Sequence, residues 1–341
     1  MRISEDIKGR TSVFGAALLL CMLCAAGCTD RSPGFQPHAF PVPAVPAMIT
    51  SMEDAAEYLA LNYWDDFTDT SRLYPCDSSI VNGVRKTEVE QAVAEWISIL
   101  GQVPAGSAEE AVGRLFDRVS ACEAKDTSSN VFEMMSAMVG KYLYDPNSPM
   151  RNEDLYLPFV TGLASYPGFT QEQREAYGYD ARMCALNRTG TPAADFEFCD
   201  RSGRTRTLYS LKADFTLLFF SNPGCEACKY IMEELESDPA LGSLISSGRL
   251  AVANIYIDED IRSWYGYQGI YPDEWYNGYD PNSVIRTDLL YNVRAIPSLY
   301  LLDRSKNVIL KDATDARVLA CLHDIAEQTG PDRKGPEPNC L

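Results

Sequence analysis

Cys225 and Cys228 are the residues of this sequence whose type and spacing could do chemistry. They follow the apolar run 216–221, which predicts a buried strand, and they open a run with helical periodicity. In the first turn of a helix, unpaired backbone N–H groups and the positive helix end favour a thiolate. The pattern therefore predicts dithiol redox chemistry, with Cys225 as the attacking thiolate and Cys228 as the resolving thiol.

This cysteine pair has two other interpretations. Half of a zinc site is the first, but zinc needs about four ligands, and beyond the apolar run 13–26 the sequence has neither a second C-x-x-C nor an H-x-x-x-H. We therefore expect no metal site, and nothing in the sequence calls for a cofactor. A structural or inert disulfide is the second interpretation, and the sequence leaves it open.

The elements that would position the pair belong to an α/β region that begins near Gly190. Further strands are expected at 250–257, 298–302 and 307–311, with helices at 225–236 and 315–327. Before this region the apolar residues recur every three to four positions, which predicts five or six helices and includes no catalytic constellation. The helical runs are 52–63, 87–100, 108–122, 131–142 and 171–187.

The α/β region resembles the thioredoxin superfamily, in particular its lipid-anchored thiol–disulfide oxidoreductases. Gly190-Thr-Pro-Ala-Ala-Asp-Phe-Glu-Phe is similar to the first strand of that branch, and Ala295-Ile296-Pro297-Ser298 to its cis-proline loop. The resemblance implies a central mixed sheet flanked by helices, preceded here by an all-α domain. It also implies that Pro297 is cis and faces the dithiol, with Ile296 binding a substrate peptide. An ordinary trans proline before a strand is the alternative.

Three residues depart from the family pattern around the dithiol. Gly224 stands where the family often has Trp, and Phe219 stands where thioredoxin has a buried acid that helps proton transfer. Glu226 lies between the two cysteines, and its negative charge should raise the pKa of the neighbouring thiol, with Lys229 opposing it. We therefore expect only modest activation of the thiolate.

The N-terminal segment predicts export and lipidation. Lys8 and Arg10 precede the apolar run 13–26, which is too short to span a bilayer comfortably, and small residues lead directly to Cys28. This resembles a bacterial lipobox. It predicts a lipoprotein signal peptide at 1–27, lipidation of Cys28 and a proline-rich tether at 28–50 without a core. A simple signal peptide and an uncut membrane anchor are the alternatives.

The resulting domain order is a helical domain at 51–188, a thioredoxin-like domain at 190–330 and a tail at 331–341. A net charge of −18 without a basic stripe argues against nucleic acid as a partner. We expect the cell envelope as the location, lipid-anchored and periplasm-facing, with the outer membrane favoured. Protein thiols and disulfides of the envelope are the expected partners, and the lipid provides the contact with the membrane.

Two further features of the sequence have open interpretations. The Tyr- and Trp-rich segment 264–276 is either a ledge that grips client peptides or an insert that packs on its own domain. Beyond the signal, the lipobox and the dithiol, a Cys321–Cys340 disulfide would staple the tail, although buried free thiols are also expected of such residues. The other cysteines of this group are Cys76, Cys122, Cys184 and Cys199.

The function predicted from these residues is extracytoplasmic thiol–disulfide exchange on envelope proteins. The alternative is a non-catalytic interaction lipoprotein that uses the same fold as a platform. A thiol peroxidase would want Thr three residues before its reactive cysteine, where Asn222 stands, and a serine hydrolase lacks its nucleophile elbow.

Overall fold

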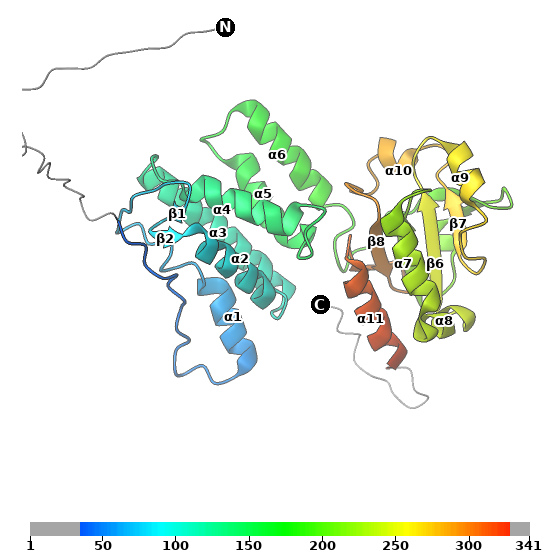
Figure 1. Cartoon of the computed structure of the whole chain (residues 1–341), viewed down its shortest axis with the longest axis horizontal. Helices are drawn as coiled ribbons and strands as arrows, with labels where there is room; N and C mark the ends of the chain where they lie inside the picture. Colours follow the sequence, from blue (N-terminus) through cyan, green and yellow to red (C-terminus); the bar gives the residue numbers. More distant parts are fainter. Residues whose placement is uncertain (1–34, 328–341) are drawn as a thin grey trace, which may run out of the picture. The chain divides into compact units, whose positions relative to one another are not determined.

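The computed structural model describes residues 35–327, and of these, residues 37–327 belong to one unit (Figure 1). The predicted signal peptide, Cys28 and the tail 331–341 lie outside the described residues. Within the described residues, every helix is too short or too polar to cross a bilayer.

The first part of the described chain is helical, as the apolar periodicity predicted. The sequence did not predict α5, which contains Pro158, a residue that usually interrupts helices. The side chain of Asn152 caps the start of α5 by accepting the N–H of Leu155 at 3.1 Å. A π-helical turn at Gly140–Tyr144 follows α4. The helices are α1 (Met52–Asn62), α2 (Lys86–Leu100), α3 (Ala105–Lys125), α4 (Val131–Val139), α5 (Glu153–Ser165) and α6 (Gln171–Cys184), with a two-stranded hairpin of β1 (Ile80–Val81) and β2 (Val84–Arg85).

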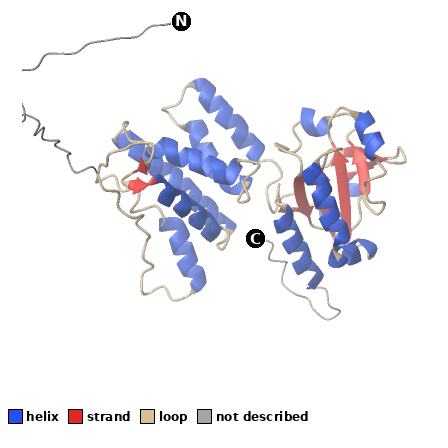
Figure 2. Ribbon diagram, in the orientation of Figure 1, coloured by secondary structure: helices blue, strands red, loops and turns tan. Residues whose placement is uncertain are grey.

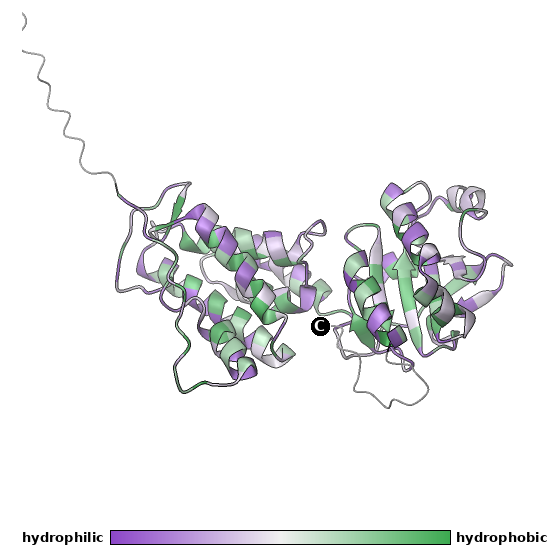
Figure 3. Cartoon of the chain, turned by 60° about the horizontal axis from the view of Figure 1, so that its bottom comes forward, coloured by the Kyte–Doolittle hydropathy of each residue, from purple (hydrophilic) through white to green (hydrophobic). Residues whose placement is uncertain are grey.

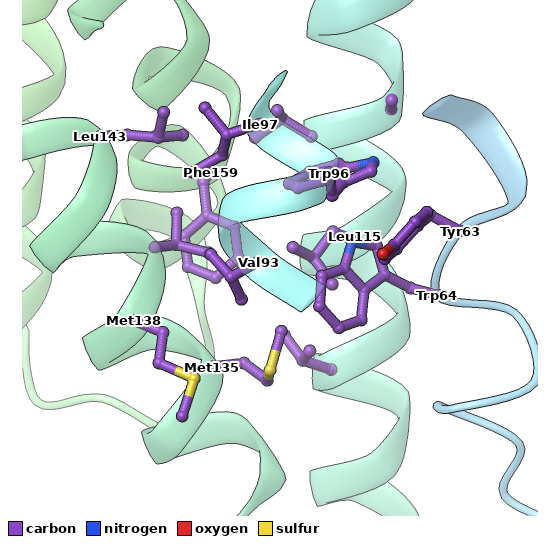
Figure 4. Close-up of a cluster of buried hydrophobic side chains, with 14 of the residues drawn as sticks. Tyr63, Trp64, Val93, Trp96, Ile97, Leu115, Met135, Met138, Leu143 and Phe159 are labelled. Carbon is purple, nitrogen blue, oxygen red and sulfur yellow. The ribbon is translucent and has the colours of Figure 1, made fainter. Parts of the chain in front are cut away.

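Trp96 of α2 lies in the middle of the helical core. Its side chain is 0% exposed, its indole N–H donates to the carbonyl of Ala60 at 2.9 Å, and its ring meets that of Trp64 edge to face. Figure 4 shows Leu115 and Phe159 converging on the same core from α3 and α5. Burying such large apolar side chains is the main favourable term that holds these helices together.

The proline-rich segment before α1 is not free of the fold, in contrast to the expected tether. The backbone N–H of His38 donates to the carbonyl of Gly83 at 3.0 Å, and the ring of Phe40 stacks on Tyr63 with centroids 5.6 Å apart. Phe40 is a large apolar residue among prolines, and its partly buried ring packs against the helical core. The prediction of a segment without core contacts is therefore wrong for this stretch.

The second part of the described chain is a seven-stranded mixed sheet with the order β4-β3-β7-β6-β5-β8-β9. β5 pairs in parallel with β6 and antiparallel with β8, so it lies inside the sheet. The strands predicted at 216–221, 250–257, 298–302 and 307–311 are confirmed, and β4 and β7 were not foreseen. Of the run 190–198, which resembles a first strand, only the last two residues lie in β3. The bounds are β3 (Glu197–Asp200), β4 (Thr205–Thr207), β5 (Phe215–Phe220), β6 (Leu250–Tyr256), β7 (Tyr276–Tyr279), β8 (Ser298–Leu302) and β9 (Val308–Leu310).

Both faces of the sheet are covered, which explains the continuous apolar runs of its inner strands. Along β5, Leu217 and Phe219 face one buried cluster, whereas Leu218 and Phe220 face another. In Figure 2 the strands gather in one sheet beside helices, and in Figure 3 the strands are mainly hydrophobic while the helices carry both colours. The helices are α7 (Glu226–Ser237), α8 (Pro239–Ser246), α9 (Ile261–Tyr267), α10 (Val284–Thr287) and α11 (Asp315–Glu327), with a 3-10 turn at Leu208–Ser210.

Gly162 of α5 allows the close approach of α3, and we predict that Gly162→Ala destabilises the protein. A Cβ atom at this position would clash with the ring of Phe116. We expect a loss of about 1–3 kcal/mol in the free energy of unfolding, measured by urea denaturation. Gly113→Ala is the matched control: its Cβ would meet Pro158 at an ordinary 3.9 Å, so it should stabilise by about 0.5–1 kcal/mol. Equal effects of the two changes would contradict this packing.

Candidate active site

Cys225 stands at the start of α7 and acts as its N-cap. Its Sγ accepts the backbone N–H of Cys228 at 3.1 Å, so the sulfur occupies the position at which a helix offers unpaired donors. The run Phe215–Phe220 forms the buried strand β5, and the turn Ser221–Gly224 carries the chain from it into α7. The local geometry predicted from the C-x-x-C context is therefore present.

The two cysteines form a disulfide with their Cα atoms 5.2 Å apart. Cys225 is half-buried, whereas Cys228 is only 1% exposed and belongs to the core cluster between the sheet and α7. A partner thiolate can therefore approach the sulfur of Cys225 more readily than that of Cys228. This asymmetry matches the predicted roles of attacking and resolving thiols.

The backbone explains why Gly224 replaces the tryptophan of the family pattern. Its φ is +73°, in the left-handed region that side chains rarely adopt. A Cβ atom built there would meet no atom within 4 Å, so the constraint comes from the backbone conformation and not from crowding.

The Ile296–Pro297 peptide bond is cis, as the resemblance implied. β8 starts at Ser298, directly after Pro297, and Ser298 pairs with Phe220 at the end of β5. The proline loop, before the start of β8, and the turn to Cys225, after the end of β5, therefore lie beside each other at one end of these two strands. Ile296 and Cys225 also pack against one apolar cluster, the one that contains Cys228.

The region behind the dithiol is apolar. Phe219 is completely buried in the same cluster as Cys228, and its ring meets that of Trp275 at a centroid distance of 6.5 Å. Glu226 is exposed, and Lys229 pairs with Glu233 at 3.7 Å, an exposed contact that contributes little. A buried phenyl ring therefore stands where thioredoxin has the carboxyl that helps proton transfer.

Sequence reasoning missed a polar network that holds the turn before Cys225. Ser221 donates its hydroxyl to Asn254 Oδ1 at 2.5 Å, and Asn254 donates to Asn277 Oδ1 at 2.9 Å. Asn222 donates to Asp258 Oδ2 at 2.5 Å. The signal was Asn254, a polar residue inside the otherwise apolar run 250–257, since a buried amide needs partners.

The aromatic segment after β6 mostly packs on its own domain. Trp264, Tyr271 and Trp275 are buried in the cluster that also holds Cys228, and burial raises the pKa of Tyr271 to about 12. Tyr265 and Ile270 remain about half exposed. The packing interpretation therefore holds for most of these rings.

The other cysteines of the described residues are mostly unpaired. Four are free thiols, and burial raises the pKa of Cys184 to about 12. They are Cys76, Cys122, Cys184 and Cys199. Cys321 is disulfide-bonded, while Cys340 lies outside the described residues. Across residues 35–327, no group of three or more His, Cys, Asp or Glu side chains could hold a metal ion.

One family model and one solved structure match most of this chain between them. A family model described as a domain of unknown function (DUF5106) matches residues 8–186. The structure of a thioredoxin-like protein from Bacteroides caccae is 36% identical, with a TM-score of 0.73, over 84% of this chain and 99% of that one. The chain is a thioredoxin-like protein with an N-terminal DUF5106 domain. The predicted fold class, a thioredoxin-like domain after a helical region, is confirmed.

Two other solved structures cover a smaller part of this chain. The C-terminal domain of an uncharacterized protein from Bacteroides fragilis is 44% identical over 40% of this chain and 98% of that one, with a TM-score of 0.39. A domain of a possible thiol-disulfide isomerase from Cytophaga hutchinsonii is 22% identical over 42% and 96%, with a TM-score of 0.36. The search of curated proteins gave no match.

The burial of the two sulfurs predicts different reactivities in the reduced protein. Iodoacetamide should modify Cys225 at least about tenfold faster than Cys228, because only the first sulfur is accessible. Peptide mapping by mass spectrometry over a time course measures both rates. Cys122, whose thiol pKa is raised by burial, is the internal control and should react as slowly as Cys228. A faster reaction at Cys228 would contradict the assigned order of the thiols.

Proposed function

We propose that this thioredoxin-like protein exchanges thiols and disulfides with client proteins through Cys225 and Cys228. The observation that carries the proposal is the position of the half-buried Cys225 at the start of α7. Its sulfur is bonded to that of the buried Cys228, and it lies at the end of β5 and β8 where Ile296 and Pro297 lie. Clients would bind as an extended strand along the backbone at Ile296.

The exchange proceeds in two balanced steps. The Cys225 thiolate attacks one sulfur of a client disulfide, forms a mixed disulfide and releases the other client sulfur as a thiolate, which takes a proton. Cys228 then loses its proton and attacks the Cys225 sulfur. The Cys225–Cys228 disulfide forms, and the second client thiol leaves. The client gains two electrons, and the protein dithiol loses them. A dithiol donor returns the protein to its reduced state.

The non-catalytic alternative has one specific observation in its favour. Phe219 fills the place where a buried acid would relay protons during exchange, and its ring is fully covered. A platform protein would capture partners through its surface, so a variant with both Cys225 and Cys228 changed to Ser would retain them. An exchange protein would lose its disulfide-linked clients in the same pull-down.

We also propose that the protein works outside the cytoplasm, lipid-anchored through Cys28 in the cell envelope and facing the periplasm, with the outer membrane favoured. The support is the short apolar run 13–26 that ends in small residues before Cys28. An oxidising compartment would also suit a resting disulfide.

Single serine variants of the two cysteines test the exchange. Cys225→Ser should lower the rate of insulin disulfide reduction by dithiothreitol at least about a hundredfold, since it removes the nucleophile. Cys228→Ser should accumulate mixed disulfides, visible on a non-reducing gel, because nothing resolves them. Cys199→Ser, a free thiol on β3, is the control and should behave as wild type. Unchanged insulin reduction by the Cys225 variant would reject the proposed exchange.

Labelled palmitate tests the anchor. In a bacterial host that expresses the full chain, the wild-type protein should carry the label and sediment with membranes. Cys28→Ala should lose both properties, because it removes the acylated thiol. Cys24→Ala, inside the apolar run, is the matched control and should keep them. A Cys28→Ala protein that still carries labelled lipid would exclude lipidation at this residue.

A further inference from the structure

The loop around Pro297 is held on both flanks by buried carboxylates. On the N-terminal flank, the side-chain amide of Asn292 donates to Glu153 Oε1 at 2.6 Å. On the C-terminal flank, the hydroxyl of Ser298 donates to Asp312 Oδ1 at 2.7 Å. Glu153 and Asp312 are only 3% and 6% exposed. The two ends of the loop are therefore fixed by side chains that belong to other elements.

Arg294 connects the two carboxylates. Its Nε donates to Glu153 Oε1 at 2.9 Å, and its second terminal nitrogen lies 3.4 Å from Asp312 Oδ2. The same guanidinium donates to the carbonyl of Tyr144 and stacks over the Tyr144 ring, 4.1 Å from its centroid. A planar group with this many fixed partners has little freedom to move. Because Arg294 lies three residues before Pro297, it restrains the loop itself.

Glu153 and Tyr144 come from the helical region, whereas Arg294 and Asp312 come from the thioredoxin-like region. Arg151 adds a second connection: its Nε donates to the carbonyl of Asp312 at 2.8 Å, and its terminal nitrogen donates to that of Ala313 at 3.0 Å. The loop thus rests on groups that the DUF5106 region supplies.

Each carboxylate of this cluster has a cationic partner. Lys311 lies 3.0 Å from Glu153 Oε2 and 3.8 Å from Asp154, and Arg188 lies 3.8 Å from the same Asp154 carboxylate. Burial raises the pKa of Asp312 to about 6, and Arg151 is the main group that opposes the rise. Removing one member would leave a buried charge without its partner, which is far more costly than losing an exposed ion pair.

We propose that Glu153, Arg294 and Asp312 are positioning residues that hold the Ile296–Pro297 loop in its peptide-binding conformation. The inference rests on the proposed exchange function and deepens it. It also gives the helical region a role: it provides the rigid support against which the substrate loop of the redox domain is set. The cluster touches neither sulfur in the described structure, so it acts on client binding and not on the electron transfer itself.

The test compares Arg294→Gln with wild type on two oxidants. With insulin as the client protein, its KM should rise by about 10–100-fold, because the backbone of the Ile296–Pro297 loop is no longer held in the conformation that binds a peptide. With a small aromatic disulfide, which needs no loop, the rate of oxidation of the reduced dithiol should stay within about twofold. Arg294→Lys should restore only part of the affinity, since an ammonium cannot reproduce the fork of contacts.

Two further variants complete the design. Arg206→Gln is the matched control: it breaks a comparable 2.8 Å ion pair with Asp200 at the opposite edge of the sheet, and its KM should not change. Ser298→Ala removes only the contact with Asp312 and serves as a milder variant if Arg294→Gln does not fold. It should raise KM in the same direction by a smaller factor.

Hydrogen exchange separates this inference from the proposed function. Arg294→Gln, or Ser298→Ala in its place, should accelerate amide exchange across residues 292–298 but not in α7, whether or not the protein is active. An active wild type whose KM and loop exchange are unchanged by these variants overturns the positioning role. A wild type without exchange activity overturns the proposed function, and the loop amides then decide the positioning role alone.

Discussion

The antiparallel pairing of β5 with β8 is the contact on which the candidate site depends. Phe220 opposite Ser298 is the last pair of that ladder, and each residue is followed or preceded directly by one of the two functional loops. A shift of register by one residue would turn every side chain of β8 to the other face of the sheet. Leu299 and Leu301 would then leave the cluster that contains Cys228. The two apolar layers therefore fix the meeting point of the two loops.

Around that meeting point, the two sulfurs experience opposite influences. The start of α7 offers Cys225 a backbone N–H donor, which favours a charged sulfur. The apolar rings of Phe219 and Trp275, in the cluster that holds Cys228, disfavour a charge on the Cys228 sulfur. In the proposed exchange, Cys225 would therefore react with the client protein and Cys228 with Cys225. Both residues are cysteines, so the difference between them comes from their surroundings in the fold.

The strongest local patterns were sufficient to predict the C-x-x-C turn, the inner strands and most of the helices. The short strand Tyr276–Tyr279 was missed because its residues alternate poorly and its place is set by β6 and β3 on either side. The cluster of Glu153, Arg294 and Asp312 was also missed. Its members are far apart in the sequence, and only the tertiary fold brings them together. Long-range ion pairs of this kind leave no periodic signal.

The left-handed turn at Gly224 has a consequence for the choice of clients. In place of a bulky indole, the position next to the reactive sulfur carries a single hydrogen and opens onto free space. That side of the dithiol exerts no steric selection. In the proposed exchange, discrimination between client proteins would therefore fall to the opposite side, where the backbone at Ile296 would bind the incoming chain.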